Sequence, residues 1–190
     1  MDGSGLGTPA CRVYKDRAIS VFKVPAAKLS ELRDRLREHG QRPSMVIHVP
    51  TPDLAEALEM VEEYGVMCEA MYLMMAADRR VLNVEREVMR GALAIISNDR
   101  VRTAHMEAMI DASARRVAEH GEDWCVQRIV EAARGDRVRA ETIVVLSAVV
   151  AAADQLVTPE EHALLKKLVV GLEIDETQAE RLLDEVLADG

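Results

Sequence analysis

A short pattern of small, apolar and acidic residues occurs twice in this chain. It reads Ala-Ala-Asp-x-x-Val-x-x-x-Glu, and both copies precede a run of residues with helical spacing. Carboxylate oxygens gathered near one turn are the ligands that hard divalent cations prefer. A divalent cation is therefore the one cofactor that the pattern suggests. Its candidate metal ligands are Asp78, Glu85, Asp154, Glu160 and Glu161.

Helix capping is a second explanation for the two glutamates that end the pattern. In Thr158-Pro159-Glu160-Glu161, the Thr158 hydroxyl would accept the amide of Glu161, whose carboxylate would reach back, as in a capping box. The first copy has Leu82 in place of the threonine, so Asn83 is the better cap and Glu85 falls in the first helical turn. Cation binding and capping both stay open.

The two aspartates follow helices, where a carboxylate faces the negative end of the helix dipole. A compensating contact is therefore expected. One such contact is structural: the carboxylate accepts backbone amides of the next turn and holds Val81 or Val157 inward. The other is functional: Asp78 and Asp154 share a cation with the nearby glutamates. A calcium-binding helix-loop-helix is excluded, since Gln155 and Leu156 stand where ligands are needed.

Other chemically capable residues favour packing over catalysis. Met67, Cys68, Met71 and Met74 follow a helical stripe, which is typical of a core. Cys125 has no partner at a recognisable spacing and is expected to be a buried thiol. The sequence contains no phosphate-binding glycine loop, dinucleotide fingerprint or nucleophile elbow, so we do not expect an enzyme.

Helices are the elements that must position these residues. Apolar spacing and caps predict a break or kink at Gly65 and seven helices from Thr51 onward. They are expected near 52–77, 83–97, 101–119, 122–134, 137–153, 159–170 and 176–188.

The first 50 residues have a different pattern. Residues 1–11 are small and turn-forming and predict a disordered tail. Residues 12–50 predict a small appendage with an α/β pattern, in which strands at 18–24 and 45–49 flank a helix through Leu36. Residues 51–190 form the predicted helical domain.

The helical domain contains an internal repeat. Asp78 and Asp154 are 76 residues apart, as are Glu85 and Glu161, and apolar positions align at the same shift. The repeats cover about 63–113 and 139–189, and each would cover the apolar face of the other across a pseudo-twofold axis. The predicted fold class is all-α, an internally duplicated helical bundle with a small N-terminal appendage.

Composition narrows the function classes. The chain is 49% hydrophobic but only 3% aromatic, which suits close helix packing. Its net charge of -9 opposes binding to nucleic acid and to anionic lipid. Three separated cysteines and the lack of a signal-peptide pattern predict a cytoplasmic protein, and no apolar run is long enough for membrane insertion.

The segment that connects the two repeats is locally basic. It is expected to be a solvated, ion-paired face or a docking surface for an acidic partner; its arginines are Arg115, Arg116, Arg128, Arg134, Arg137 and Arg139.

The repeated Ala-Ala-Asp, Val and Glu, together with an acid-started turn at Asp99 and Asp175, resemble the tellurite-resistance TerB family over about 63–189. Members usually carry glycine after the aspartate, where this chain has Arg79 and Gln155, which argues against a left-handed turn residue here. The resemblance implies a non-enzymatic stress-response scaffold that binds a protein partner, including a membrane-associated one. The alternative is a regulator that responds to a divalent metal. A homo-oligomer is compatible with either.

Overall fold

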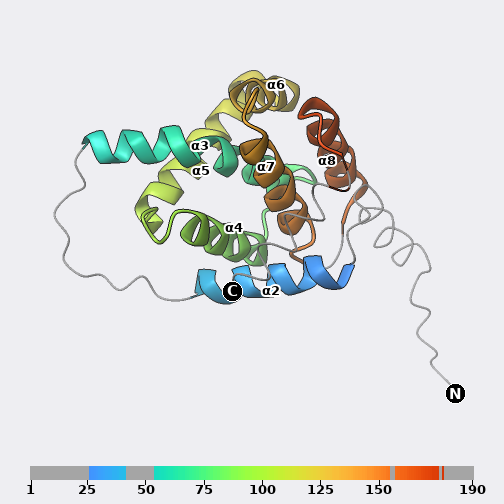
Figure 1. Cartoon of the computed structure of the whole chain (residues 1–190), viewed down its shortest axis with the longest axis horizontal. Coiled ribbons are helices and arrows are strands. Elements are labelled where there is room, and N and C mark those ends of the chain that lie inside the picture. The colour runs from blue at the N-terminus through green and yellow to red at the C-terminus, as the bar shows by residue number, and fades with distance from the viewer. Residues whose placement is uncertain (1–25, 42–53, 155–156, 176, 178–190) are drawn as a thin grey trace, which may run out of the picture.

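The computed structural model describes residues 26–41, 54–154, 157–175 and 177, and every element in these ranges is an α-helix (Figure 1). The predicted all-α class is confirmed. The predicted tail, both strands and nearly all of the helix at 176–188 lie outside the described residues. The helices are α2 Ala26–Gln41, α3 Leu54–Ala76, α4 Asn83–Ile96, α5 Thr103–His120, α6 Glu122–Ala132, α7 Arg137–Ala151 and α8 Pro159–Gly171.

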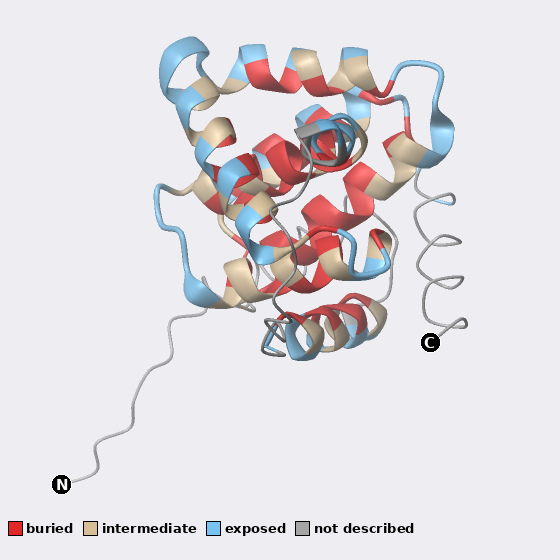
Figure 2. Ribbon diagram, turned by 90° about the vertical axis from the view of Figure 1, so that its left-hand side faces the viewer, coloured by how far each residue is buried: buried red, intermediate tan, exposed pale blue. Residues whose placement is uncertain are grey.

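Helix α7 lies at the centre of the bundle. It contacts α2, α3, α4 and α8, and all of its residues from 143 to 151 are buried (Figure 2). A helix that is apolar on all sides is stable only when neighbours cover it. The longest apolar run in the sequence is thus an interior helix. In the described part of the chain, we find no helix with the length and apolar character that a membrane crossing requires.

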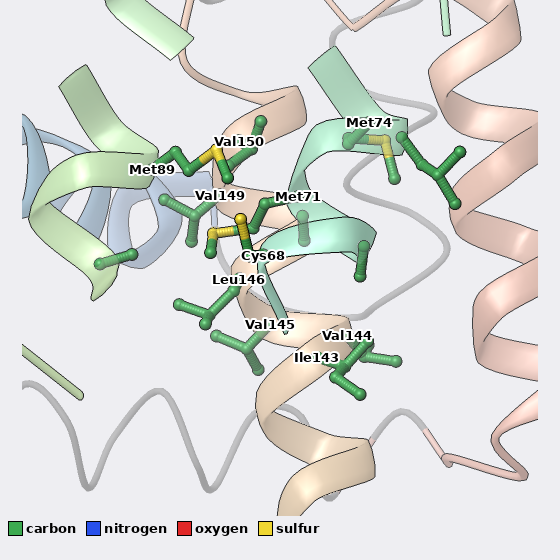
Figure 3. Close-up of a cluster of buried hydrophobic side chains, with 14 of the residues drawn as sticks. Cys68, Met71, Met74, Met89, Ile143, Val144, Val145, Leu146, Val149 and Val150 are labelled. Carbon is green, nitrogen blue, oxygen red and sulfur yellow. The ribbon is translucent and has the colours of Figure 1, made fainter. Parts of the chain in front are cut away.

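Methionines of α3 fill much of the space against α7. Met71, Met74 and Met75 are fully buried together with Cys68, and Figure 3 shows Cys68 and Met71 beside Leu146 and Val149 of α7. The flexible thioether side chain suits a core with few aromatic residues. The prediction that this stripe is core packing is confirmed. Helix α3 also continues through Gly65, so the helix is not broken there.

Helix α2 packs closely on α4, and the two helices lie side by side at the bottom of Figure 1. A Cβ atom on Gly40 would lie 1.9 Å from the carbonyl oxygen of Glu87, and one on Gly91 would lie 1.7 Å from that of Leu36. Only glycine permits this approach at both positions. Helix α2 also buries Leu29, Leu32 and Leu36 in the same core as α3 to α8.

Candidate functional site

The first acidic turn joins α3 to α4 and begins with Asp78. Its Oδ1 accepts the backbone N–H of Arg80 at 2.8 Å, which is the structural contact expected for an aspartate at this position. The same turn contains a left-handed residue, Arg79, at φ 63°. The expectation of no left-handed residue after the aspartate was therefore wrong: the turn keeps this conformation although its residue is not glycine.

Glu85 binds the start of α4. Its Oε2 accepts the backbone N–H of Leu82 at 2.8 Å, and the side chain is buried. Leu82 is the N-cap and Asn83 the first helical residue, so the prediction of Asn83 as the cap was wrong. Because leucine has no acceptor, only half of a capping box exists at this helix. Val81 is 42% exposed, which corrects the expectation that it points inward.

The second acidic turn contains the complete capping box. The Glu161 carboxylate accepts the N–H of Thr158 at 2.7 Å, and the Thr158 hydroxyl oxygen accepts the N–H of Glu161 at 3.2 Å. Pro159 is the first residue of α8, and Val157 is buried. The box and the inward valine are as predicted for this copy.

The two turns lie close enough for their carboxylates to repel one another. Burial is the main cause that raises the pKa of Glu85 to about 7; the Leu82 amide opposes this rise, and the negative charges of Glu161, Asp154 and Asp78 contribute to it. Burial likewise raises the pKa of Glu161 to about 7, with contributions from Asp154 and Asp78. The fold thus brings four of the five predicted ligands into one electrostatic neighbourhood. The fifth, Glu160, is exposed on the first turn of α8.

The donors in this neighbourhood do not form a metal cage. In the described ranges, no group of three or more His, Cys, Asp or Glu side chains is arranged to hold a metal ion. Asp78, Glu85 and Glu161 each direct a carboxylate oxygen toward a backbone amide. Metal binding at Asp78, Glu85, Asp154, Glu160 and Glu161 stays a prediction.

Helix α2 places a positively charged side chain at the C-terminal end of α7. Arg33 is buried, and its Nη1 donates a long hydrogen bond of 3.5 Å to the carbonyl of Ala152, the C-cap of α7. An arginine at this helix end satisfies a carbonyl and opposes the negative end of the dipole. Sequence reasoning missed this contact, although Arg33 lies directly beside the stripe of Leu29, Leu32 and Leu36.

A second polar cluster lies inside the bundle between α3, α5 and α6. Glu69 is fully buried and accepts from Arg116 Nε at 2.8 Å and from Arg128 Nε at 3.2 Å, while Arg128 Nη2 also contacts its carboxylate. Arg116 donates further to the hydroxyl of Ser113. Arg116 and Arg128 are ion-paired, as one of the two predictions held, but their partner is a buried acid and not an acid of a solvated face. The sequence signal that could have revealed this cluster is Glu69 itself, a single acidic residue between Cys68 and Ala70 in a stripe of core residues.

The thiols of Cys68 and Cys125 are both buried. Burial raises the pKa of Cys68 to about 12 and also raises that of Cys125. The thiolate, which is the nucleophile and the metal ligand, is disfavoured at both sites. The prediction of a buried thiol at Cys125 is confirmed.

A cavity of about 410 Å³ lies between the α6–α7 turn and the end of α8. Apolar side chains of Val130, Ala133 and Leu172 line it together with the charged Arg134 and Glu173. None of the five predicted ligands lines this cavity. It is therefore separate from the acidic turns.

Comparisons of this chain with protein-family models, with curated proteins and with solved structures gave no match. The fold and the local geometry define the class: an α-helical bundle in which two acidic turns meet.

Proposed function

We propose that this protein is a non-enzymatic, cytoplasmic helical adaptor of the TerB type that acts in a stress response by binding a protein partner. The proposal rests on the structural role of the repeated acidic residues. Asp78, Glu85 and Glu161 accept backbone amides of their own turns, so these residues stabilise the bundle. A bundle held in this way presents its surface to a partner, as the resemblance to TerB implies.

The internal duplication is part of this proposal. Both acidic turns place a glutamate at the third position of the next helix. Both of these helices also end alike, since the N–H of Asp99 donates to the Ala94 carbonyl and that of Ile174 to the Val169 carbonyl. These similarities support two related units. The second helix is one residue shorter, because α4 has 14 residues and α8 has 13.

Site-specific crosslinking tests the adaptor function. A photoreactive amino acid replaces Trp124, Val138 or Val170, three exposed side chains, in the full chain within its native cells. We expect the same protein, soluble or membrane-associated, to be crosslinked from one of these positions, more strongly under tellurite stress. A helical protein of similar charge is the control. If no position gives an adduct beyond that control, the adaptor proposal fails, and an adduct with a second copy would show a homo-oligomer.

The second candidate function is a regulator that responds to a divalent metal. The mutual repulsion of Asp78, Glu85, Asp154 and Glu161 favours it, because a cation would neutralise these charges. Binding to the folded state alone must raise the melting temperature. Calcium, magnesium, manganese and zinc are titrated into chelator-treated protein and into Asp154→Asn. A saturable rise that the variant loses would support the regulator, and no rise at millimolar ion would eliminate it.

A further inference from the structure

The α3–α4 turn, residues 79–82, differs from the other acidic turn in what it exposes. Arg79, Arg80, Val81 and Leu82 are all exposed. In the α7–α8 turn, by contrast, the valine after the aspartate is buried, and a threonine caps the next helix. The fold can therefore bury a valine and cap a helix at such a turn. The exposed valine and the leucine N-cap of the α3–α4 turn are therefore not required by a turn of this type.

Three residues of this turn are locally unfavourable. Arg79 adopts a left-handed conformation, which costs free energy for any residue other than glycine. Val81 is 42% exposed, and Leu82 occupies an N-cap where it cannot accept a hydrogen bond. Natural proteins depart from locally stable choices mainly at functional sites. Three departures in four residues make this turn a candidate functional surface.

The charges of the turn indicate what it binds. Within the described part of the chain, the side chains of Arg79 and Arg80 are exposed and form no ion pair and no hydrogen bond. A free guanidinium pairs well with a carboxylate through two parallel hydrogen bonds. The adjacent Val81 and Leu82 expose apolar surface that aliphatic side chains of a partner would remove from water.

We propose that the α3–α4 turn is a docking site for an acidic segment of a partner protein that also carries aliphatic side chains. Carboxylates of the segment pair with Arg79 and Arg80, and its aliphatic side chains cover Val81 and Leu82. A protein segment fits better than a membrane, since the two arginines of this turn are fewer than the roughly four to eight basic residues typical of lipid-binding clusters. The proposal rests on the proposed function as a partner-binding module.

Fluorescence anisotropy of a dye-labelled peptide of alternating Glu and Leu, titrated with the full chain, tests the proposal. We expect saturable binding with a Kd below about 1 mM that weakens with salt. Arg79→Ser with Arg80→Ser should weaken it by about tenfold, because both charged contacts are lost and each, being exposed, contributes little. Lys166→Ser and Val61→Ser, which alter an exposed basic residue and an exposed valine elsewhere, should leave it unchanged.

Leu82→Thr separates docking from folding. The threonine restores a cap and should raise the melting temperature by about 2–4 °C, yet weaken peptide binding because the apolar anchor is smaller. Unchanged binding in this variant would overturn the role of Leu82 as an anchor. Equal binding of a Glu-Ser peptide would show that charge alone is recognised and would overturn the proposal.

Two further outcomes also overturn the docking site. One is the absence of saturable peptide binding at millimolar concentration. The other is stronger binding to phosphatidylserine vesicles than to the peptide, which would make the turn a membrane contact. If crosslinking still captures a partner and the Arg79→Ser, Arg80→Ser protein captures it equally, the adaptor function stands and only this surface is wrong. If no partner is captured either, both proposals fail.

Discussion

Glu85 and Glu161 should make the protein less stable as the pH rises. Burial and neighbouring acids raise their pKa from 4.5 to about 7, so the folded state binds protons that the unfolded chain releases. Their contribution is fully present below about pH 4.5 and is lost as the pH rises through 7. We expect the free energy of unfolding to fall by about 5 kcal/mol between pH 5 and pH 8 from this pair.

Urea unfolding followed by circular dichroism, in chelator, measures this pH dependence. Glu85→Gln keeps the oxygen that accepts the Leu82 amide but cannot ionise, so it should flatten the dependence and stabilise the protein at pH 8. Glu160→Gln removes an exposed acid from the first turn of α8, outside the neighbourhood of Glu85, and is the control. An equal pH slope in Glu85→Gln and in the unmodified protein would contradict the assignment.

Arg79→Gly should stabilise the protein by about 0.5–1 kcal/mol. A left-handed conformation costs a non-glycine residue about 1–2 kcal/mol, and part of the gain is offset by the greater freedom of glycine in the unfolded chain. Thermal unfolding gives the difference. Arg80→Gly is the control, because Arg80 has no positive φ and the change should be neutral or unfavourable. A loss of stability in Arg79→Gly alone would mean that the arginine side chain supports the turn.

At the scale of single residues, the sequence predicted contacts that depend on local spacing. Two such contacts are the capping box of Thr158 and Glu161 and the hydrogen bond from the Arg80 amide to Asp78. Each joins residues only two or three positions apart, so local spacing determines it. The bonds of Glu69 to Arg116 and Arg128 join residues 47 and 59 positions apart. Only the packing of three helices brings these side chains together, and no local pattern encodes it.

The crossing of α2 and α4 predicts opposite effects for two glycine substitutions. Ala is normally the better helix residue by about 1 kcal/mol. Gly65→Ala should therefore stabilise α3, since a Cβ there meets nothing closer than 3.6 Å. Gly91→Ala should destabilise the protein by about 2 kcal/mol or more, because its Cβ would overlap the Leu36 carbonyl and force the helices apart. Urea midpoints compare the two, and a stabilised Gly91→Ala protein would show that α2 is free to move.

The buried cluster of Glu69 predicts a large loss when its charge is removed. Glu69→Gln leaves Arg116 and Arg128 without a counter-charge and should cost about 2–4 kcal/mol, less than for fully buried partners because each arginine side chain stays about a third exposed. Glu87→Gln breaks an exposed pair with Arg37 and should cost less than about 1 kcal/mol. Similar midpoints for both variants would mean that Glu69 contributes no more than a surface pair.

At the scale of elements, helical spacing and caps predicted α3 to α8 with bounds close to those observed. Helix periodicity is repeated over many residues, so a local window contains it. The role of α2 could not be predicted in this way. Its contact with α4 depends on two glycines 51 positions apart, Gly40 and Gly91, and neither has a local signature of a crossing.

At the scale of the whole molecule, one core joins α2 to the remaining helices. The buried cluster extends from Leu29 on α2 to Leu168 on α8 without a gap between separate units. The sequence predicted residues 12–50 as an appendage because their pattern differs from the helical repeat. The described part of that segment nevertheless packs on α4 and α7. Its removal should therefore affect the entire fold.

Deletion of residues 1–41 should destabilise residues 42–190 severely. Leu29, Leu32 and Leu36 are each no more than 5% exposed. Burial of one such side chain contributes about 2 kcal/mol, so the three together supply about 6 kcal/mol. That is comparable to the 5–15 kcal/mol that typically separates folded from unfolded protein. We expect a lower urea midpoint, a smaller slope and binding of a hydrophobic dye.

Because the truncated chain could aggregate, Leu32→Ala in the full chain gives an independent reading of the same contact. A cavity at this buried site should cost about 2–4 kcal/mol. Val138→Ala removes apolar atoms from a side chain that is 69% exposed and should change stability little. If the truncated protein keeps the full midpoint and Leu32→Ala matches Val138→Ala, then α2 is an independent appendage. A loss in both experiments would instead make α2 an integral part of the bundle, because the face of α4 that contains Gly91 would need it as a cover.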